Sequence, residues 1–224
     1  MPLSVYRFVH AQHHAHLGQP DDLELWPFVV PGTPRWVRLL CAAAELLAGF
    51  FYTPIVFARA VIAGRHQLPS GQAARIVAEY GLCVLTWAAI LTVTAAYDGW
   101  QALLVGYFVP ITIAGNLQSL RKFTEHMGLC GDTVLSTTRT VVDPRWFGRL
   151  LSTSMLHIDY HGTHHRYAKV PHYHLPSATP LVYKPGNAAV PIYNSYASAM
   201  FDMLGTLADP RVGRQWLAAK AESP

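Results

Sequence analysis

The residues His157-Ile-Asp-Tyr-His161-Gly-Thr-His164-His165 form the stretch around which the rest of the chain is organised. On an α-helix, residues three, four, seven and eight apart return to one face, so the four histidines are predicted to share a stripe. Neutral imidazole is the commonest metal ligand in proteins, and iron, copper, zinc and nickel all accept it. The stripe therefore predicts a metal site.

A second cluster with the same H-x-x-H-H spacing lies near the start of the chain, at His10-Ala-Gln-His13-His14. Two matching clusters with apolar segments between them predict two halves of one metal centre. The alternative is a pair of histidine-rich surface turns, and one such cluster alone would be weak support for a metal.

The composition points to a membrane protein. Hydrophobic residues make up 51% of the 224-residue chain and charged residues only 13%, whereas soluble domains carry about 25% charged residues. The formal net charge of +4 is better explained by membrane topology than by nucleic-acid binding, so no nucleic-acid partner is expected.

Three apolar runs cover residues 36–63, 78–97 and 100–120. Crossing a bilayer takes about 20 predominantly apolar residues, and the last two runs, joined by an Asp98-Gly99 turn, are predicted to form a helical hairpin. The first run is predicted to lie in the interface, or to dip into the bilayer and return, because charges within a membrane are costly. Its interruptions are Glu45, Pro54 and Arg59.

If both histidine clusters bind one metal centre, the number of crossings between them must be even, as the hairpin provides. All 17 Lys and Arg residues fall outside residues 78–120, so the positive-inside rule places both clusters in the cytoplasm. The predicted fold is all-α: a multi-pass membrane bundle with its histidine-bearing helices facing the cytoplasm.

Single polar residues near the hairpin are further candidates. His126 follows the second hairpin helix on the side of the two clusters, which makes it a candidate ligand. Glu125 could accept a hydrogen bond from an imidazole or be a solvated charge, and Asn116 could orient a water or bond within its helix. The remaining histidines, His66, His172 and His174, are predicted to be loop residues.

These motifs resemble the integral-membrane fatty acid desaturase and hydroxylase superfamily. The first cluster is similar to the second histidine box of that family, the second cluster to its third box, and residues 121–126 to the segment that supplies an additional ligand. The resemblance implies a centre of two non-haem iron ions that activates O2, with these ligands: His10, His13, His14, His126, His161, His164 and His165. Supporting residues around the ligands would be Asn116, Glu125, His157 and Asp159.

The resemblance also implies a fatty acyl or acyl-lipid substrate and oxygen-dependent desaturation. Hydroxylation by the same centre is the closest alternative, and a non-catalytic metal-binding membrane fragment is an alternative of another class. The expected partners are the membrane and a separate electron donor, a ferredoxin or a b-type cytochrome.

One departure from the family pattern concerns its first histidine box, which has no counterpart because residues 1–9 contain no histidine. A single desaturase-like domain over residues 1–224, truncated at its N-terminus, is therefore expected, with the missing box and two apolar runs encoded upstream of Met1. His16 and His157 are possible substitutes, since His157 makes an H-x3-H pair with His161.

The C-terminal region contains an amphipathic run from Ile192 to Leu207, predicted to cap the site or to lie on the membrane. Core packing is expected for its large side chains: Tyr193, Tyr196, Phe201 and Met203.

Overall fold

The computed structural model describes residues 1–183 and 190–217, and their regular secondary structure is almost entirely helical, as predicted. The described part contains one small parallel sheet, in which Thr140 pairs with Ile192 and Val141 with Tyr193. In chain order the elements are α1 (Leu3–His16), α2 (Arg35–Ala63), η1 (Arg65–Gln67), α3 (Gln72–Ala96), α4 (Trp100–Leu103), η2 (Leu104–Phe108), α5 (Val109–His126), β1 (Thr140–Val141), α6 (Trp146–Ser154), α7 (His161–Arg166), η3 (His172–His174), α8 (Leu175–Val182), β2 (Ile192–Tyr193) and α9 (Tyr196–Thr206).

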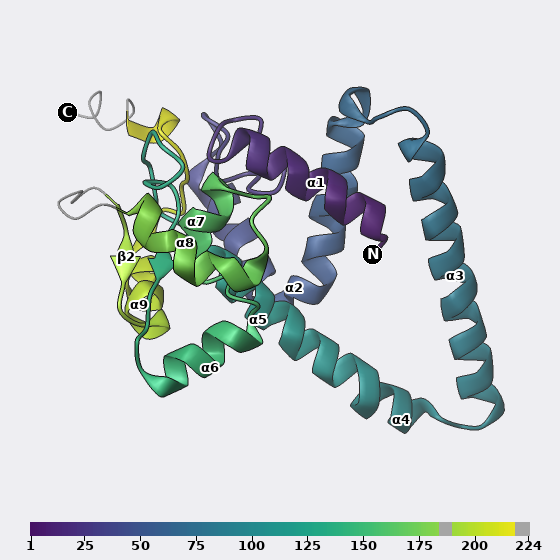
Figure 1. Cartoon of the computed structure of the whole chain (residues 1–224). Coiled ribbons are helices and arrows are strands. Elements are labelled where there is room, and N and C mark those ends of the chain that lie inside the picture. The colour runs from purple at the N-terminus through teal and green to yellow at the C-terminus, as the bar shows by residue number, and fades with distance from the viewer. Residues whose placement is uncertain (184–189, 218–224) are drawn as a thin grey trace.

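The apolar runs form long helices. Among the described residues, three helices are long and apolar enough to cross a membrane: α2, α3 and the continuous helix Trp100–His126, which comprises α4, the π-helical turn η2 and α5. Figure 1 shows α3 and α4–α5 as the two arms of a hairpin whose turn lies far from the other helices. Asp98 takes a left-handed φ of 48° at this turn, so the predicted helical hairpin is confirmed.

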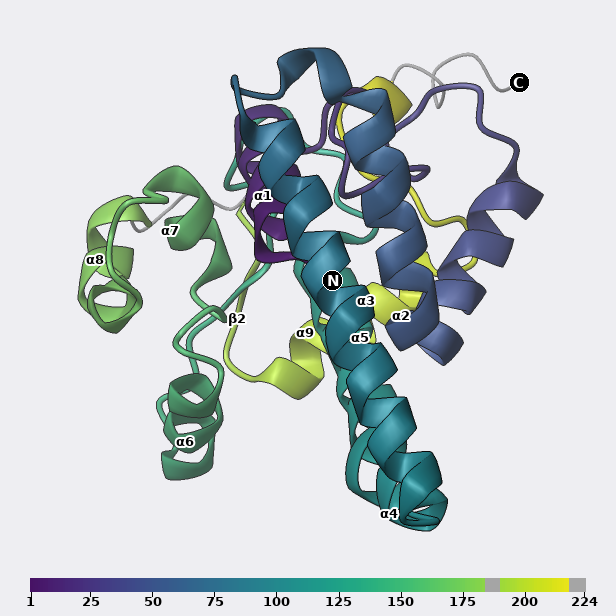
Figure 2. The ribbon, with the colours of Figure 1, turned by 90° about the vertical axis from the view of Figure 1, so that its right-hand side faces the viewer.

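Helix α2 is bent where its backbone leaves helical geometry at Ala48 (φ −137°, ψ 37°), and Figure 2 shows its two arms as a V. A break frees backbone groups that need other partners. The side chain of Asn116 on α5 provides them, since its Oδ1 accepts from the Gly49 amide at 3.0 Å and its Nδ2 donates to the Leu47 carbonyl at 3.1 Å. The shape suits a helix that dips into the bilayer and returns, and its placement in the bilayer stays a prediction.

Two glycines allow α2 and α5 to cross closely beside this bend. A Cβ on Gly115 would lie 2.8 Å from the backbone nitrogen of Phe50, and one on Gly49 would lie 2.7 Å from the carbonyl oxygen of Gly115. Backbone atoms cannot swing aside as a flexible side chain can. The crossing therefore depends on both positions having no side chain.

Adding one methyl group at this crossing is expected to destabilise the protein. Gly115→Ala should lower the midpoint of thermal unfolding in detergent, with a cost of about 1–3 kcal/mol, because overpacking forces the backbones apart. Gly81→Ala is the matched control, since a Cβ on Gly81 of α3 meets no atom within 4 Å. Equal midpoints for the two variants would contradict the close crossing.

Helix α1 presents two adjacent faces. Its apolar face, formed by Val5, Phe8 and Val9, is buried against Phe57 and Ala60 of α2. The neighbouring face carries the first histidine cluster, because these histidines follow the apolar residues at helical spacing. Burial of the apolar face thus fixes which way the histidines point.

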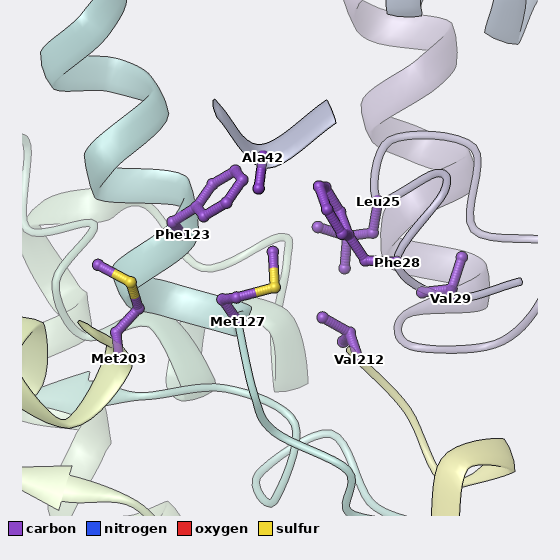
Figure 3. Close-up of a cluster of buried hydrophobic side chains, with 8 residues drawn as sticks. All are labelled: Leu25, Phe28, Val29, Ala42, Phe123, Met127, Met203 and Val212. Carbon is purple, nitrogen blue, oxygen red and sulfur yellow. The ribbon is translucent and has the colours of Figure 1, made fainter. Parts of the chain in front are cut away.

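A second buried cluster supports the C-terminal end of α5 (Figure 3). Phe123 and Met127 flank the end of the helix, and full burial of each such side chain contributes about 1.5–3 kcal/mol. The other members are Leu25, Phe28, Val29, Ala42, Met203 and Val212. The predicted core position of Met203 is confirmed. The same prediction for Phe201 is wrong, because its side chain lies on the outer face of α9 and is 69% exposed.

Candidate metal centre

Three helices bring the seven predicted ligand histidines together. α1 supplies three from the first cluster, α5 supplies one at its C-terminal end, and α7 supplies three from the second cluster. Their rings pack against one another, as the centroid separation of 4.2 Å between His14 and His165 shows. Residues from the two ends of a 156-residue stretch thus meet in one place.

The histidines divide into two neighbouring groups. The outer group is half-buried and consists of His10, His14 and His164, with His14 Nε2 lying 3.2 Å from His10 Nε2 and 3.0 Å from His164 Nε2. The inner group is buried and consists of His13, His126, His161 and His165. Within it, His161 Nε2 lies 2.8 Å from His126 Nε2 and 3.0 Å from His165 Nε2.

These spacings fit a bound metal ion. A first-row ion about 2.1 Å from each of two imidazole nitrogens at right angles holds those nitrogens about 3.0 Å apart. Without an ion, a nitrogen of a neutral imidazole carries either one N–H or one lone pair, so a nitrogen with two such neighbours can form a hydrogen bond with only one of them. The donor set therefore suits a metal in each group better than hydrogen bonding alone.

The outward-facing Nδ1 atoms of three ligand candidates have acceptors. His10 Nδ1 lies 3.1 Å from Glu24, His13 Nδ1 lies 2.9 Å from Asp22, and His126 Nδ1 lies 3.2 Å from the Thr137 carbonyl. Such acceptors fix the tautomer that leaves Nε2 for a metal. Within the described ranges, the buried Nδ1 atoms without a partner include those of His14, His161 and His165.

The electrostatics favour neutral imidazole over most of the site. Burial, with the neighbouring imidazoles, lowers the pKa of His14 to about 3 and that of His164 to about 4. The same causes lower the pKa values of His161 and His165 well below the ordinary range. Neutral imidazole is the form that binds metals, so these four side chains need not lose a proton first.

His13 behaves differently because two carboxylates face it. Burial works against its charged form, but Asp22 and then Glu24 hold the pKa of His13 above its ordinary value. Burial opposes ionisation of Glu24 as well, yet His13 and His10 lower the pKa of that carboxyl well below its usual range. Two carboxylates therefore lie against the Nδ1 sides of His10 and His13, where their charge would offset that of a cation.

The carboxylate of Glu125 lies beside the Nε2 atom of His161, the nitrogen that would bind a metal. Its Oε2 is 3.6 Å from His161 Nε2, while Arg121 Nη1 donates to its Oε1 at 2.5 Å. Glu125 thus faces Nε2 of His161, and it is buried rather than a solvated charge. Glu125, His126 and His161 form a set whose ligand atoms lie within 4.8 Å of one another.

The segment after α5 holds the end of that helix in place. The Arg139 amide donates to the Glu125 carbonyl at 2.8 Å, and its guanidinium Nη1 donates to the carbonyls of Thr124 at 3.2 Å and Met127 at 2.7 Å. The side chain of Arg139 is buried and also pairs with Asp202 of α9. These bonds satisfy the last carbonyls of α5 and orient the turn that carries His126.

The prediction that His157 extends the stripe of the second cluster is wrong. α7 begins at His161, and His157 takes a left-handed φ of 56° in the preceding turn. Its Nδ1 donates to Ser152 Oγ at 2.9 Å, and its ring stacks near His172 with centroids 6.2 Å apart. It therefore does not join either histidine group, and the proposed H-x3-H substitute with His161 does not form.

Two other supporting candidates also lie elsewhere. Asp159 accepts from Ser152 Oγ at 2.8 Å and so belongs with the turn around His157. Asn116 binds the broken backbone of α2, so its bonds go to a neighbouring helix and not to a residue within its own helix. The substitute His16 lies at the last turn of α1 outside both groups. The remaining histidines, His66, His172 and His174, occupy exposed turns, as predicted.

The carboxylates of Asp22 and Glu24 were missed in the sequence because they lie beyond the end of α1. Gly18, with a left-handed φ of 66°, turns the chain back so that both carboxylates reach the histidines of α1. The available signal was an acidic pair within ten residues of a histidine cluster, separated from it by a glycine and a proline.

A cavity of about 580 Å³ adjoins the outer group, and its lining includes His164, Tyr6 and Leu156. A second, more apolar hollow of about 410 Å³ lies between α5 and α6. Gln118, Arg121 and Met155 line both, so the two hollows adjoin. An elongated apolar molecule that enters between α5 and α6 would extend toward the histidines.

The fold and the site together define a membrane protein with a histidine-rich centre. The family model described as fatty acid desaturase matches residues 1–196, and the chain belongs to this family. Among curated proteins, the omega-3 fatty acid desaturase fat-1 of Caenorhabditis elegans is 32% identical over 109 residues, which cover 44% of this chain and 26% of that protein. The matched part thus spans about a quarter of the relative's length. No solved structure gives a significant match.

Proposed function

We propose that this chain is an oxygen-dependent acyl-lipid desaturase whose two histidine groups hold a pair of non-haem iron ions. One observation carries the proposal: three imidazoles in the outer group and four in the inner group converge beside a cavity that adjoins an apolar hollow. The family match and the omega-3 desaturase relative support the substrate class.

The residues of the chain would have distinct tasks. Iron bound in the two groups would supply the oxidising power to break an unactivated C–H bond, which side chains cannot provide. Asp22, Glu24 and the Thr137 carbonyl would keep three imidazoles oriented, with Nε2 toward the ion. Burial of the inner group would exclude water. The cavity would hold the acyl chain beside His164.

The proposal includes a cytoplasmic site and a separate electron donor. His14 Nε2 and His164 Nε2 are 3.0 Å apart, so the chain between them must cross the bilayer an even number of times. The hairpin meets this requirement if α2 dips and returns. All 17 Lys and Arg lie outside residues 78–120, which favours a cytoplasmic position for both termini of the hairpin. A ferredoxin or a b-type cytochrome would deliver the electrons there.

The topology can be tested by cysteine accessibility in intact cells. We expect a cysteine replacing Gly99 at the hairpin turn to react with an impermeant maleimide from outside. A cysteine replacing Ser70, in the turn between α2 and α3, should react only after the cells are opened. The unchanged chain measures the background from the native cysteines. Labelling of the Ser70→Cys variant in intact cells would mean that α2 crosses the bilayer and would contradict the proposed arrangement.

The activity is tested by metal content and lipid analysis of cells that express the chain. We expect about two iron ions per purified chain and acyl chains with a new double bond, identified by mass spectrometry, in expressing cells alone. Hydroxylated acyl chains without a new double bond would show that the reaction is hydroxylation and not desaturation. Less than one iron ion per chain, together with unchanged lipids, would reject the enzyme in favour of a non-catalytic membrane protein.

A further inference from the structure

Helix α6 turns its small and polar residues toward the protein and its apolar residues away from it. Gly148 and Ser152, four residues apart on one face, are buried. A Cβ on Gly148 would lie 2.1 Å from Asp143 Cγ, and Ser152 Oγ donates to Asp159 at 2.8 Å. A surface helix of a soluble protein has the opposite arrangement, with its apolar face inward.

The outward face is large and apolar. Trp146 is 77% exposed, Phe147 60% and Leu150 59%. These three side chains lie within one turn and project to the side opposite Gly148 and Ser152. Contiguous exposed apolar patches of this kind mark surfaces that contact a protein or a membrane, because exposing them to water is unfavourable.

The position of α6 indicates what covers this face. Figures 1 and 2 both show α6 beyond the histidine-bearing helices, on the side toward which the hairpin α3–α4 extends. Leu117 of α5 is 60% exposed on the membrane-spanning hairpin, and it lines the same hollow as Leu151 of α6. The exposed apolar surface of the hairpin therefore continues onto α6.

Two cations border the patch. Arg145 at the start of α6 has a side chain that is 65% exposed and pairs with Asp143, and Arg149 is exposed on the flank of the helix. Tryptophan beside arginine is typical of helices at a membrane surface, where the ring enters the boundary between headgroups and acyl chains and the cation contacts phosphate. A nine-residue helix is too short to cross the bilayer.

We propose that α6 lies on the cytoplasmic surface of the bilayer, with Trp146, Phe147 and Leu150 inserted among the lipids and Arg149 at the phosphates. The lipid contact is independent of the desaturase reaction, because it rests on the hairpin and on the reversed polarity of α6, whereas its cytoplasmic side rests on the proposed topology. The turn after α6 lines the cavity at His164 through Met155 and Leu156. Contact of α6 with lipid therefore sets the depth of that cavity relative to the membrane surface.

The proposal is tested on the full chain in vesicles of phosphatidylcholine with a minor share of phosphatidylglycerol. The three native cysteines are replaced by alanine, and a polarity-sensitive fluorophore is attached to a single new cysteine. This cysteine replaces Phe147 or, as the matched control on the opposite flank of α6, Arg149. At position 147 we expect blue-shifted emission and a loss of roughly half the intensity on adding spin-labelled lipid. At position 149 iodide in the water should be the stronger quencher.

A second measurement leaves the native cysteines in place. The fluorescence difference between the unchanged chain and its Trp146→Phe variant isolates Trp146, and brominated lipid should quench that difference. Strong iodide quenching at position 147 without lipid quenching would overturn the proposal by placing the face in water. Shielding from both quenchers would also overturn it, since a protein partner would then cover α6.

Discussion

His161→Ala is expected to abolish turnover and to release at least one metal ion per chain. The imidazole of His161 has Nε2 within 3.0 Å of the Nε2 atoms of both His126 and His165, so its loss removes the central member of the inner group. Alanine offers no donor, and the buried position gives no access for a replacement side chain. Iron per chain and the yield of desaturated lipid measure the two effects.

The same loss is expected for His13→Ala and His165→Ala, which remove other members of the inner group. His66→Ala and His174→Ala are the controls, because both side chains are exposed in turns outside either histidine group. Monodisperse elution in detergent confirms that each variant is folded. Full activity and unchanged iron in His161→Ala would eliminate the inner group as a metal site.

Asp22→Asn is expected to lower the affinity for metal by about 10–100-fold, the usual cost of removing a group that orients a ligand. The buried carboxylate accepts from His13 Nδ1 and from the backbone amides of Gly18, Glu24 and Leu25. An amide has only one acceptor oxygen, and its NH2 group would face a donor. His13 would then lose its orientation, and the turn after α1 would lose part of its support.

Competition with a chelator measures this affinity, with metal retained by the protein as the readout. Asp21→Asn is the matched control, since it makes the same chemical change one residue earlier at an exposed position. We expect Asp21→Asn to retain metal as the unchanged chain does. If both variants released metal at the same chelator concentration, Asp22 would have no role in orienting His13.

The parts of the site that the sequence could predict follow from helical spacing. H-x-x-H-H places three imidazoles on one side of a helix, and this holds for α1 and for α7. Likewise, two apolar runs separated only by Asp98 and Gly99 have few alternatives to a helical hairpin. These features depend on residues close together in the chain.

The features that could not be predicted depend on tertiary contacts. His157 lies outside the expected stripe because Leu156 and His157, which follow the end of α6, both take left-handed φ values, although neither is a glycine. Asn116 binds the backbone of α2 only because α2 breaks at Ala48, a position with no sequence signal. Glu125 faces Nε2 because the chain after α5 returns and fixes the last turn of that helix.

His14 and His164 lie 150 positions apart in the chain, yet their Nε2 atoms are 3.0 Å apart, and this separation bears on the order of events during biosynthesis. α1 leaves the ribosome before α7, so neither histidine group is complete until α7 follows. If the intervening hairpin inserts into the bilayer as proposed, before α7 meets α1, membrane insertion would precede assembly of the proposed metal centre. Metal loading would then be a late step of maturation, and a chain arrested within the hairpin would reach the membrane without a complete site.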